Sequence, residues 1–221
     1  MEEILLRYRT LLSDIDAWFG RCQSRYPEKI ACGPGCSACC RALFDITLLD
    51  AALLQQGFRQ LEERTRREVL KRAQPILARL QARWPGFEHP YLLNALPEEE
   101  WEVPGEDETV CPLLGADGRC LVYAHRPTTC RLHGLPNIDL SGEVFSDGCC
   151  TRNFPGGVPL SEEGLRWEFR RAFAAEYDLL GAFTRELFGR PLLELDTLIP
   201  AALFIDFSRL PSADSLPRRK V

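Results

Sequence analysis

Apolar side chains recur every three or four positions along much of the chain, and this period predicts a largely helical protein. The first apolar stripe runs through residues 2–27. A second helix is expected to be capped by Asp50 and to end at Gly57. A long polar helix should follow over about 59–83, where Pro75 is expected to kink or divide it.

The last third of the sequence has a similar helical pattern. Ser161 is the expected N-cap of a long helix that ends at Gly189, and a shorter apolar helix should follow over about 197–208. The fold class is therefore predicted to be mainly α: one helical domain over 1–210, with an irregular cysteine-rich metal-binding region and a small β-hairpin. Residues 211–221 are polar and basic, and are expected to form a disordered tail.

The middle of the chain is richer in turn-forming residues. Residues 84–109 contain many prolines and acids, which predicts a surface loop. Because 59–83 is rich in arginine, we expect the acidic part of this loop to lie against that helix. The Asp-Gly pair at 117–118 separates two short apolar runs and indicates a hairpin, which would bring Cys111 and Cys120 together.

Nine of the ten cysteines lie in three short stretches of the chain. In the first, four thiols fall within nine residues, and the intervening glycines permit a tight turn. Thiolate sulfur is a strong ligand for zinc and for iron–sulfur clusters. The candidate metal ligands are Cys32, Cys36, Cys39, Cys40, Cys111, Cys120, Cys130, Cys149 and Cys150.

Charge and hydropathy narrow the class of protein. The formal net charge of −5 gives no general attraction to nucleic acid or to an anionic membrane. The arginines of 59–83 are not interleaved with aromatic residues that would stack on bases, so that face is interpreted as solvated. No stretch approaches the ~18–20 apolar residues of a spanning helix, and the start of the chain is acidic, unlike a signal peptide. These features predict a cytoplasmic protein that binds neither nucleic acid nor membrane, and they leave a protein partner open.

In a reducing compartment, grouped cysteines indicate metal binding more often than disulfides. The adjacent pairs 39–40 and 149–150 agree with this, because a bridge between sequence neighbours is strained. A structural zinc site and a four-iron cluster each take about four ligands. Nine thiols therefore suit two mononuclear sites, one multinuclear cluster, or one site with spare thiols, and the expected cofactor is zinc or iron.

Four further residues bear on this site. Cys22 continues the first apolar stripe and is expected to lie in the core, whereas His133 is the best histidine for a mixed cysteine–histidine site. Arg126 and Arg131 are predicted to offset the negative charge of the thiolates and to donate hydrogen bonds to sulfur. The sequence contains no glycine-rich phosphate-binding motif and no Gly-x-Ser-x-Gly elbow, so no catalytic residue is assigned.

A compound motif covers about half of the chain: Cys32-x3-Cys36-x2-Cys39-Cys40, then Cys111-Pro112-Leu113-Leu114, Arg119-Cys120-x2-Tyr123 and Arg126-Pro127-x2-Cys130-Arg131. It resembles the YkgJ-type cysteine-cluster family, which is described as a zinc- or iron-chelating domain. A similar cluster occurs in bacterial flagellin lysine-N-methylases, which are thought to use an iron–sulfur centre with S-adenosylmethionine. The resemblance implies metal ligands at Cys36, Cys39, Cys40, Cys111, Cys120 and Cys130, with Cys32 also in the motif.

These observations support two function classes. The first is a non-enzymatic protein that stores or senses zinc or iron, or uses the metal structurally. The alternative is an iron–sulfur or metal-dependent enzyme that modifies a protein side chain. An enzyme needs an accessible metal position with an adjacent pocket, whereas a structural site is closed and its chelation unfolds the protein. A redox-thiol module, a third class, would be metal-free with cysteines of low pKa.

Overall fold

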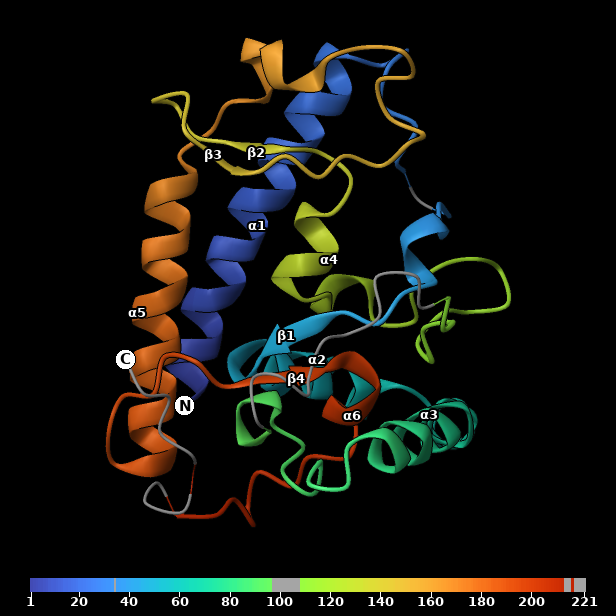
Figure 1. The fold of residues 1–221 in the computed structure, drawn as a ribbon, viewed down its shortest axis with the longest axis vertical. Coiled ribbons are helices and arrows are strands. Elements are labelled where there is room, and N and C mark those ends of the chain that lie inside the picture. Colours follow the sequence, from blue (N-terminus) through green and yellow to red (C-terminus); the bar gives the residue numbers. More distant parts are fainter. Residues whose placement is uncertain (34, 97–107, 213–215, 217–221) are drawn as a thin grey trace.

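The computed structural model describes residues 1–33, 35–96, 108–212 and 216. This part of the chain is mainly α, as predicted, and its strands form two small antiparallel pairs (Figure 1). The α-helices are α1 (Glu2–Arg25), α2 (Leu48–Gln60), α3 (Glu63–Arg83), α4 (Thr128–Leu132), α5 (Phe169–Phe188) and α6 (Ile199–Ala202). The strands are β1 (Asp45–Thr47), β2 (Asn137–Ile138), β3 (Val144–Ser146) and β4 (Asp196–Leu198).

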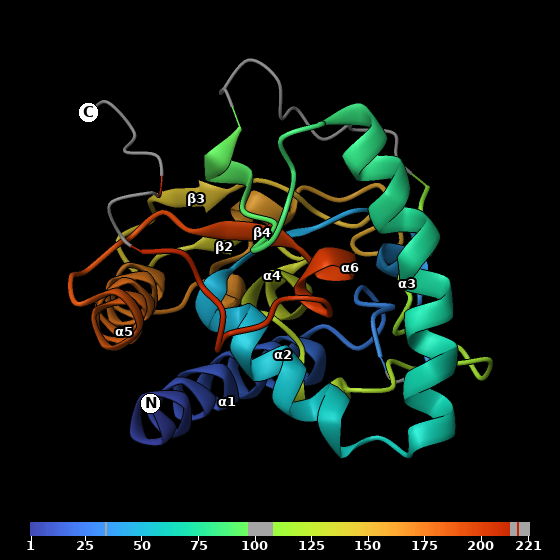
Figure 2. The same ribbon diagram turned by 90° about the horizontal axis from the view of Figure 1, so that it is seen from below.

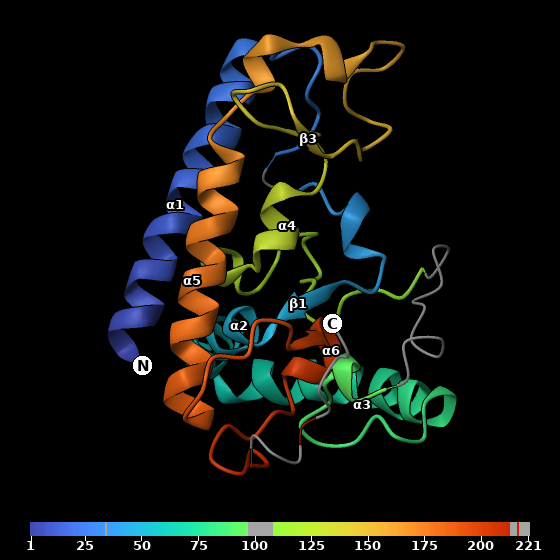
Figure 3. The same cartoon turned by 60° about the vertical axis from the view of Figure 1, so that its left-hand side comes forward.

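Helices α1 and α5 form a long antiparallel pair along one side of the molecule (Figure 3). The indole Nε1 of Trp18 donates a 3.0 Å hydrogen bond to the carbonyl oxygen of Leu165, just before α5. The same indole meets the ring of Phe169 edge-on, with 4.9 Å between ring centroids. At the other end of the pair, the amino group of Met1 forms an ion pair with Glu186. The buried face of α1 is the stripe expected from the sequence: Ile4, Leu5, Tyr8, Leu12, Ile15, Trp18 and Cys22.

A small sheet joins two segments far apart in sequence. Strands β1 and β4 pair antiparallel, with Ile46 opposite Thr197. The prediction of a helix over 197–208 is therefore wrong at both ends, because its first residues belong to β4 and α6 stops at Ala202. Gln55 of α2 explains the early stop, since its side-chain amide donates to the carbonyl oxygens of Ala202 and Ile205, at 2.8 and 2.7 Å.

The second helix differs from its prediction at both ends. Its N-cap is Thr47, whose hydroxyl accepts from the backbone N–H of Asp50 at 3.0 Å, so Asp50 is not the cap. The side chain of Asp50 is instead buried in the protein interior. Gly57 does not end the helix, which continues to Gln60. Gly57 serves close packing, because a Cβ at this position would lie 2.5 Å from the ring of His125.

Helix α3 continues through Pro75 as one helix and lies along the flank of the molecule (Figure 2). Its buried residues are Val69, Ala73, Leu77 and Leu80, so the polar helix has one apolar face that packs inward. The expected surface loop that follows is also packed in its described part, because Phe87 and Leu93 are fully buried. Residues 97–107 lie outside the described part, so the pairing of the acidic loop with α3 stays a prediction.

The long helix of the last third begins later than predicted. Ser161 lies in a 3-10 turn rather than at an N-cap, a second such turn covers Glu163–Leu165, and α5 begins at Phe169. The intervening chain stays extended because the N–H of Trp167 donates to the carbonyl oxygen of Ile138 at 3.0 Å. The end of α5 at a glycine is confirmed, since Gly189 closes the helix with a φ of 74°.

The cysteine-rich region is irregular, as predicted. Residues 111–120 form a tight turn with an isolated antiparallel bridge between Leu114 and Cys120 in place of an extended hairpin. Gly118 permits the turn with a φ of 78°. Arg72 of α3 fixes this segment by donating to the carbonyl oxygen of Leu114 at 2.8 Å. The regular hairpin, β2–β3, lies further along the chain, between α4 and the Cys149–Cys150 pair.

Most of the predicted tail lies outside the described residues, and the domain boundary at 210 stays a prediction. Leu216 is described, and it is buried in the main core. A search of the described helices finds none with the length and hydropathy needed to cross a membrane.

Candidate metal centre

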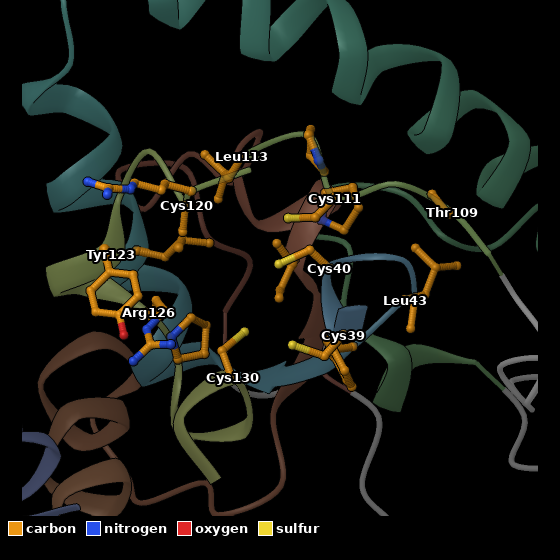
Figure 4. A pocket seen from close by; sticks show the side chains of 18 of the residues that line it. Cys39, Cys40, Leu43, Thr109, Cys111, Leu113, Cys120, Tyr123, Arg126 and Cys130 are labelled. Atoms are coloured by element: carbon orange, nitrogen blue, oxygen red, sulfur yellow. The ribbon is translucent and has the colours of Figure 1, made fainter. Parts of the chain in front are cut away.

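A cavity of about 70 Å³ collects six of the nine predicted ligands. Figure 4 shows the sulfurs of Cys39, Cys40, Cys111 and Cys130 turned toward one another across this space. Apolar side chains make up most of the remaining wall, including Leu43, Phe44 and Leu113. We refer to five of the lining residues, whose sulfurs all lie within electrostatic range of one another, as the pocket cysteines: Cys39, Cys40, Cys111, Cys120 and Cys130. Cys36 also lines the cavity, so the six cysteines there are the same six that the sequence resemblance implies.

Local structure explains how three distant segments reach this cavity. A short 3-10 helix, Ala38–Cys40, presents two adjacent thiols, and the N–H of Cys111 donates to the carbonyl oxygen of Cys40 at 2.9 Å. The bridge to Leu114 places Cys120 beside Cys111. Cys130 reaches the cavity from α4, which begins at Thr128 and has Pro127 as its N-cap.

Burial controls the charge state of these thiols. Burial raises the pKa of Cys111 to about 11, and it also raises the pKa of Cys120 and Cys130. Cys39 donates a hydrogen bond to Cys40, which raises the pKa of Cys39 and lowers that of Cys40. Without a cation, most of this pocket therefore holds protons at neutral pH, and a metal ion must displace them.

The two predicted arginines lie beside the pocket but contact it differently. The guanidinium of Arg126 stacks 3.8 Å from the ring centroid of Tyr123 and lines the cavity, and its charge opposes the burial that raises the pKa of Cys120. The guanidinium of Arg131 is buried and pairs with Asp16. It also donates to the carbonyl oxygens of Ala124 and Arg126, at 2.9 and 3.0 Å. Arg131 thus holds the loop that carries Arg126. Among the described hydrogen bonds of these two arginines, none reaches a sulfur.

The other three predicted ligands gather around Gly134, and one of them, Cys32, also lies within electrostatic range of Cys39. We call Cys32, Cys149 and Cys150 the loop cysteines. A Cβ on Gly134 would lie 3.2 Å from the sulfur of Cys32 and 3.8 Å from the Cβ of Cys150. The Cys149 sulfur is 3.4 Å from the carbonyl oxygen of Gly134. The structure thus divides the nine candidates into two neighbourhoods, a division that spacing along the chain does not show.

A second cavity, of about 310 Å³, lies against the same centre. Cys36, Cys39, Cys130 and Arg126 line both cavities, so they form the wall between them. The Nε atom of Arg126 is buried and is one of the described side-chain atoms without a hydrogen-bond partner. The pocket cysteines therefore have a roomy, partly polar space next to them.

The structure describes the surroundings of Cys22 and His133, the further cysteine and the histidine considered as core residue and ligand. Cys22 is fully buried in α1 and its thiol faces the carbonyl oxygen of Gly164 at 3.7 Å, so its placement in the core is confirmed. His133 packs edge-on against Phe44, with 5.1 Å between ring centroids, and burial lowers its pKa. Its role as a ligand stays a prediction.

The donor set fits zinc or iron by its chemistry, since about four thiolates complete either kind of site. Six thiols line the one small cavity, which exceeds that number. In the part of the chain that the structure describes, no three cysteine, histidine, aspartate or glutamate side chains already stand as they do around a bound ion. Metal binding therefore requires the sulfurs to move closer together.

A buried polar cluster that the sequence motifs do not indicate lies beside α4. The hydroxyl of Tyr8 lies 2.6 Å from both Asp50 and Thr128, and 3.0 Å from Glu176. Burial raises the pKa of both carboxyls. One signal was present: Tyr8 and Asp50 both fall on apolar helix faces, where a polar group needs a partner.

Comparisons with known proteins identify one family. The family model described as "CxxCxxCC: Putative zinc- or iron-chelating domain" matches residues 31–150, more than half of the chain. No curated protein matches, and no solved structure matches. The matched range contains both the pocket cysteines and the loop cysteines.

Proposed function

Since this chain belongs to the CxxCxxCC family of zinc- or iron-chelating domains, we propose that it chelates zinc or iron through the pocket cysteines. The observation that carries the proposal is the meeting of six thiols, the five pocket cysteines and Cys36, from three segments around one cavity of about 70 Å³. The neighbouring cavity of about 310 Å³ is lined by four cysteines, fewer than line this one. The ion would complete a soft sulfur donor set.

Each group has a distinct task in this proposal. The pocket cysteines bind the ion as thiolates and release their protons. The guanidinium of Arg126 offsets part of the resulting negative charge, as its effect on the pKa of Cys120 indicates. Arg131 positions Arg126 through its carbonyl contacts, and its charge also opposes the burial that raises the pKa of Cys120.

Zinc and iron differ in what they would supply. Zinc in a closed four-sulfur site has a structural or handling role. Iron bound by four thiolates supports electron transfer or cluster chemistry. The cavity of about 310 Å³ beside the centre favours an exposed face, as a metal-exchanging or substrate-binding protein needs.

The type of protein within this family, and any enzymatic activity, stay predictions. We retain the similarity to YkgJ-type proteins as a hypothesis, and we treat iron–sulfur chemistry and a methylase-like activity as the alternative function. The comparisons supply no support for that alternative. A cytoplasmic location without a nucleic-acid partner is likewise our proposal, based on net charge and on free thiols that a reducing compartment preserves.

The test is the metal content and absorption spectrum of protein purified without air. Colourless protein with zinc supports chelation of zinc, whereas iron with sulfide and absorption near about 400 nm supports the iron–sulfur alternative. Cys111→Ser with Cys120→Ser should remove the pocket metal. Cys22→Ser is the matched control, because it changes a thiol that lies in the core beside Gly164. Metal-free wild-type protein, after growth with zinc and iron, would overturn the proposal.

A further inference from the structure

We propose that Cys32, Cys149 and Cys150, with Cys36, form a second metal position that takes a thiophilic divalent cation such as zinc. It adjoins the pocket cysteines, because Cys32 and Cys36 line the cavity of about 310 Å³ together with Cys39, but it rests on contacts of its own around Gly134. The proposal concerns a second ion and does not depend on which metal the pocket holds.

Gly134 is the point at which the loop cysteines meet. Its carbonyl oxygen accepts a 3.2 Å hydrogen bond from the N–H of Cys150 and faces the Cys149 sulfur at 3.4 Å. Its φ of 112° is a conformation that favours glycine. The absence of a side chain there lets the Cys32 sulfur approach to 3.2 Å from the position a Cβ would occupy.

Asn153 ties the two cysteine-bearing segments together. Its side-chain amide donates to the Cys32 sulfur at 3.2 Å and to the carbonyl oxygen of Gly134 at 2.7 Å. Its Oδ1 accepts from the N–H of Ala31 at 2.9 Å. One fully engaged, buried side chain therefore holds Cys32 against the segment that carries Cys149 and Cys150, and a buried amide with this many partners rigidifies its surroundings.

Cys36 supplies the fourth sulfur. The turn closed by the N–H of Cys36 and the carbonyl oxygen of Gly33, at 3.0 Å, returns the chain toward Cys32. The guanidinium of Arg152 donates to the Cys36 sulfur at 3.7 Å, so the segment after Cys150 also reaches this thiol. Four thiolates around a divalent ion leave an excess of negative charge, and Arg152 is placed to offset part of it.

The donor set and its exposure decide the ligand class. Sulfur-only coordination selects zinc and other thiophilic metals over magnesium or calcium. All four cysteines are partly exposed, so the ion can exchange with solvent. The pocket cysteines are also partly exposed, but they line a cavity with largely apolar walls. The two positions therefore differ in the polarity of their surroundings, since Asn153 and Arg152 donate to sulfurs at the second one.

The experiment counts cobalt ions bound by metal-free protein prepared without air. Cobalt(II) replaces zinc, and its sulfur-to-metal absorption reports thiolate ligation. Wild-type protein should bind two equivalents, and Cys149→Ser with Cys150→Ser should bind one. Cys111→Ser with Cys120→Ser should also retain one equivalent, bound by the loop cysteines. Cys22→Ser should keep both.

A second variant guards against misfolding of the double mutant. Gly134→Ala leaves every cysteine in place but puts a Cβ 3.2 Å from the Cys32 sulfur, so it should weaken one equivalent at least tenfold while the other is unchanged. If Cys149→Ser with Cys150→Ser still takes two equivalents, the second position does not exist. If wild-type protein takes one, which Cys111→Ser with Cys120→Ser abolishes, the second position fails and the pocket proposal stands. If wild-type protein takes none, both fail.

Discussion

The backbone N–H of Thr128 donates a 3.0 Å hydrogen bond to Oδ1 of Asp50, and this contact joins α4 to α2. Thr128 begins α4 two residues before Cys130. Its hydroxyl also donates to Glu176 of α5 at 2.9 Å, and Tyr8 of α1 lies within 2.6 Å of it. Four helices thus meet at one buried polar cluster, and the position of Cys130 in the metal centre depends on it.

This cluster predicts a specific dependence of stability on pH. Burial raises the pKa of Asp50, and the neighbouring Glu176 raises it further. Above about pH 4, the folded protein therefore holds a proton that the unfolded chain has lost. The stabilisation that comes from the proton on Asp50 is fully present below about pH 4. It is lost as the pH rises through the raised pKa of Asp50.

Asp50→Asn should retain an oxygen that accepts from Thr128 and should flatten the loss of stability with rising pH. The measurement is urea unfolding of metal-free protein between about pH 5 and pH 8. Asp14→Asn, at an exposed position of α1, is the control and should keep the slope of the wild type. If Asp50→Asn lost stability with rising pH as steeply as the wild type, the Asp50 carboxyl would not be the source of the pH dependence.

Gly57 should tolerate no side chain, because a Cβ there would lie 2.5 Å from the ring of His125. Gly57→Ala is expected to lower the free energy of unfolding by about 1–3 kcal/mol, the usual cost of overpacking. Gly20→Ala is the matched control, since Gly20 is also within a helix and has nothing within 4 Å of its Cβ position. That variant should be stabilised by up to about 1 kcal/mol. Equal effects at the two positions would contradict the packing seen here.

Local sequence pattern predicts much of the fold. The stripe of α1 and the glycine stop at Gly189 follow from helical period and from backbone conformation, which are local properties. The β1–β4 pairing does not follow, because each strand is three residues long and its partner is distant in the chain. The cap at Thr47 does not follow from local pattern either, because a tertiary contact with the N–H of Thr128 determines the position of the Asp50 side chain.

The two arginines beside the pocket should respond differently to substitution. Arg131→Ala removes a buried guanidinium, its ion pair with the half-exposed Asp16 and two carbonyl contacts, so it should lower the free energy of unfolding by about 1.5–3 kcal/mol. Arg126→Ala should leave the fold intact and weaken metal binding by about 10–100-fold, whereas Arg126→Lys should retain most of the affinity. Thermal unfolding and competition with a chromophoric chelator separate the two effects. Full metal affinity in Arg126→Ala would remove its proposed role.

The identity of the cysteines as candidate ligands is readable from the sequence, but their grouping is not. Cys32 and Cys40 belong to one short motif, yet Cys32 lies against Gly134 while Cys40 faces the cavity with Cys111. The division depends on Asn153, a residue that no cysteine spacing indicates. Tertiary contacts of this kind decide which thiols share an ion.

Metal affinity should rise with pH. Because burial raises the pKa of Cys111 and Cys130, these thiols carry protons that the metal must displace. Each proton released makes the apparent affinity change up to about tenfold per pH unit. Zinc competition measured from about pH 6 to pH 8 should therefore show a steep increase. A flat profile would indicate that these two thiols do not bind the ion.

The most direct test of the central claim is X-ray absorption at the metal edge of protein purified without air. Ligation by the pocket cysteines predicts a first shell of about four sulfur atoms, at about 2.3 Å for zinc. Cys111→Ser with Cys120→Ser should lose the metal of the pocket, and Cys22→Ser should give the spectrum of the wild type. A first shell of oxygen and nitrogen atoms, or an unchanged metal content in Cys111→Ser with Cys120→Ser, would contradict chelation by these cysteines.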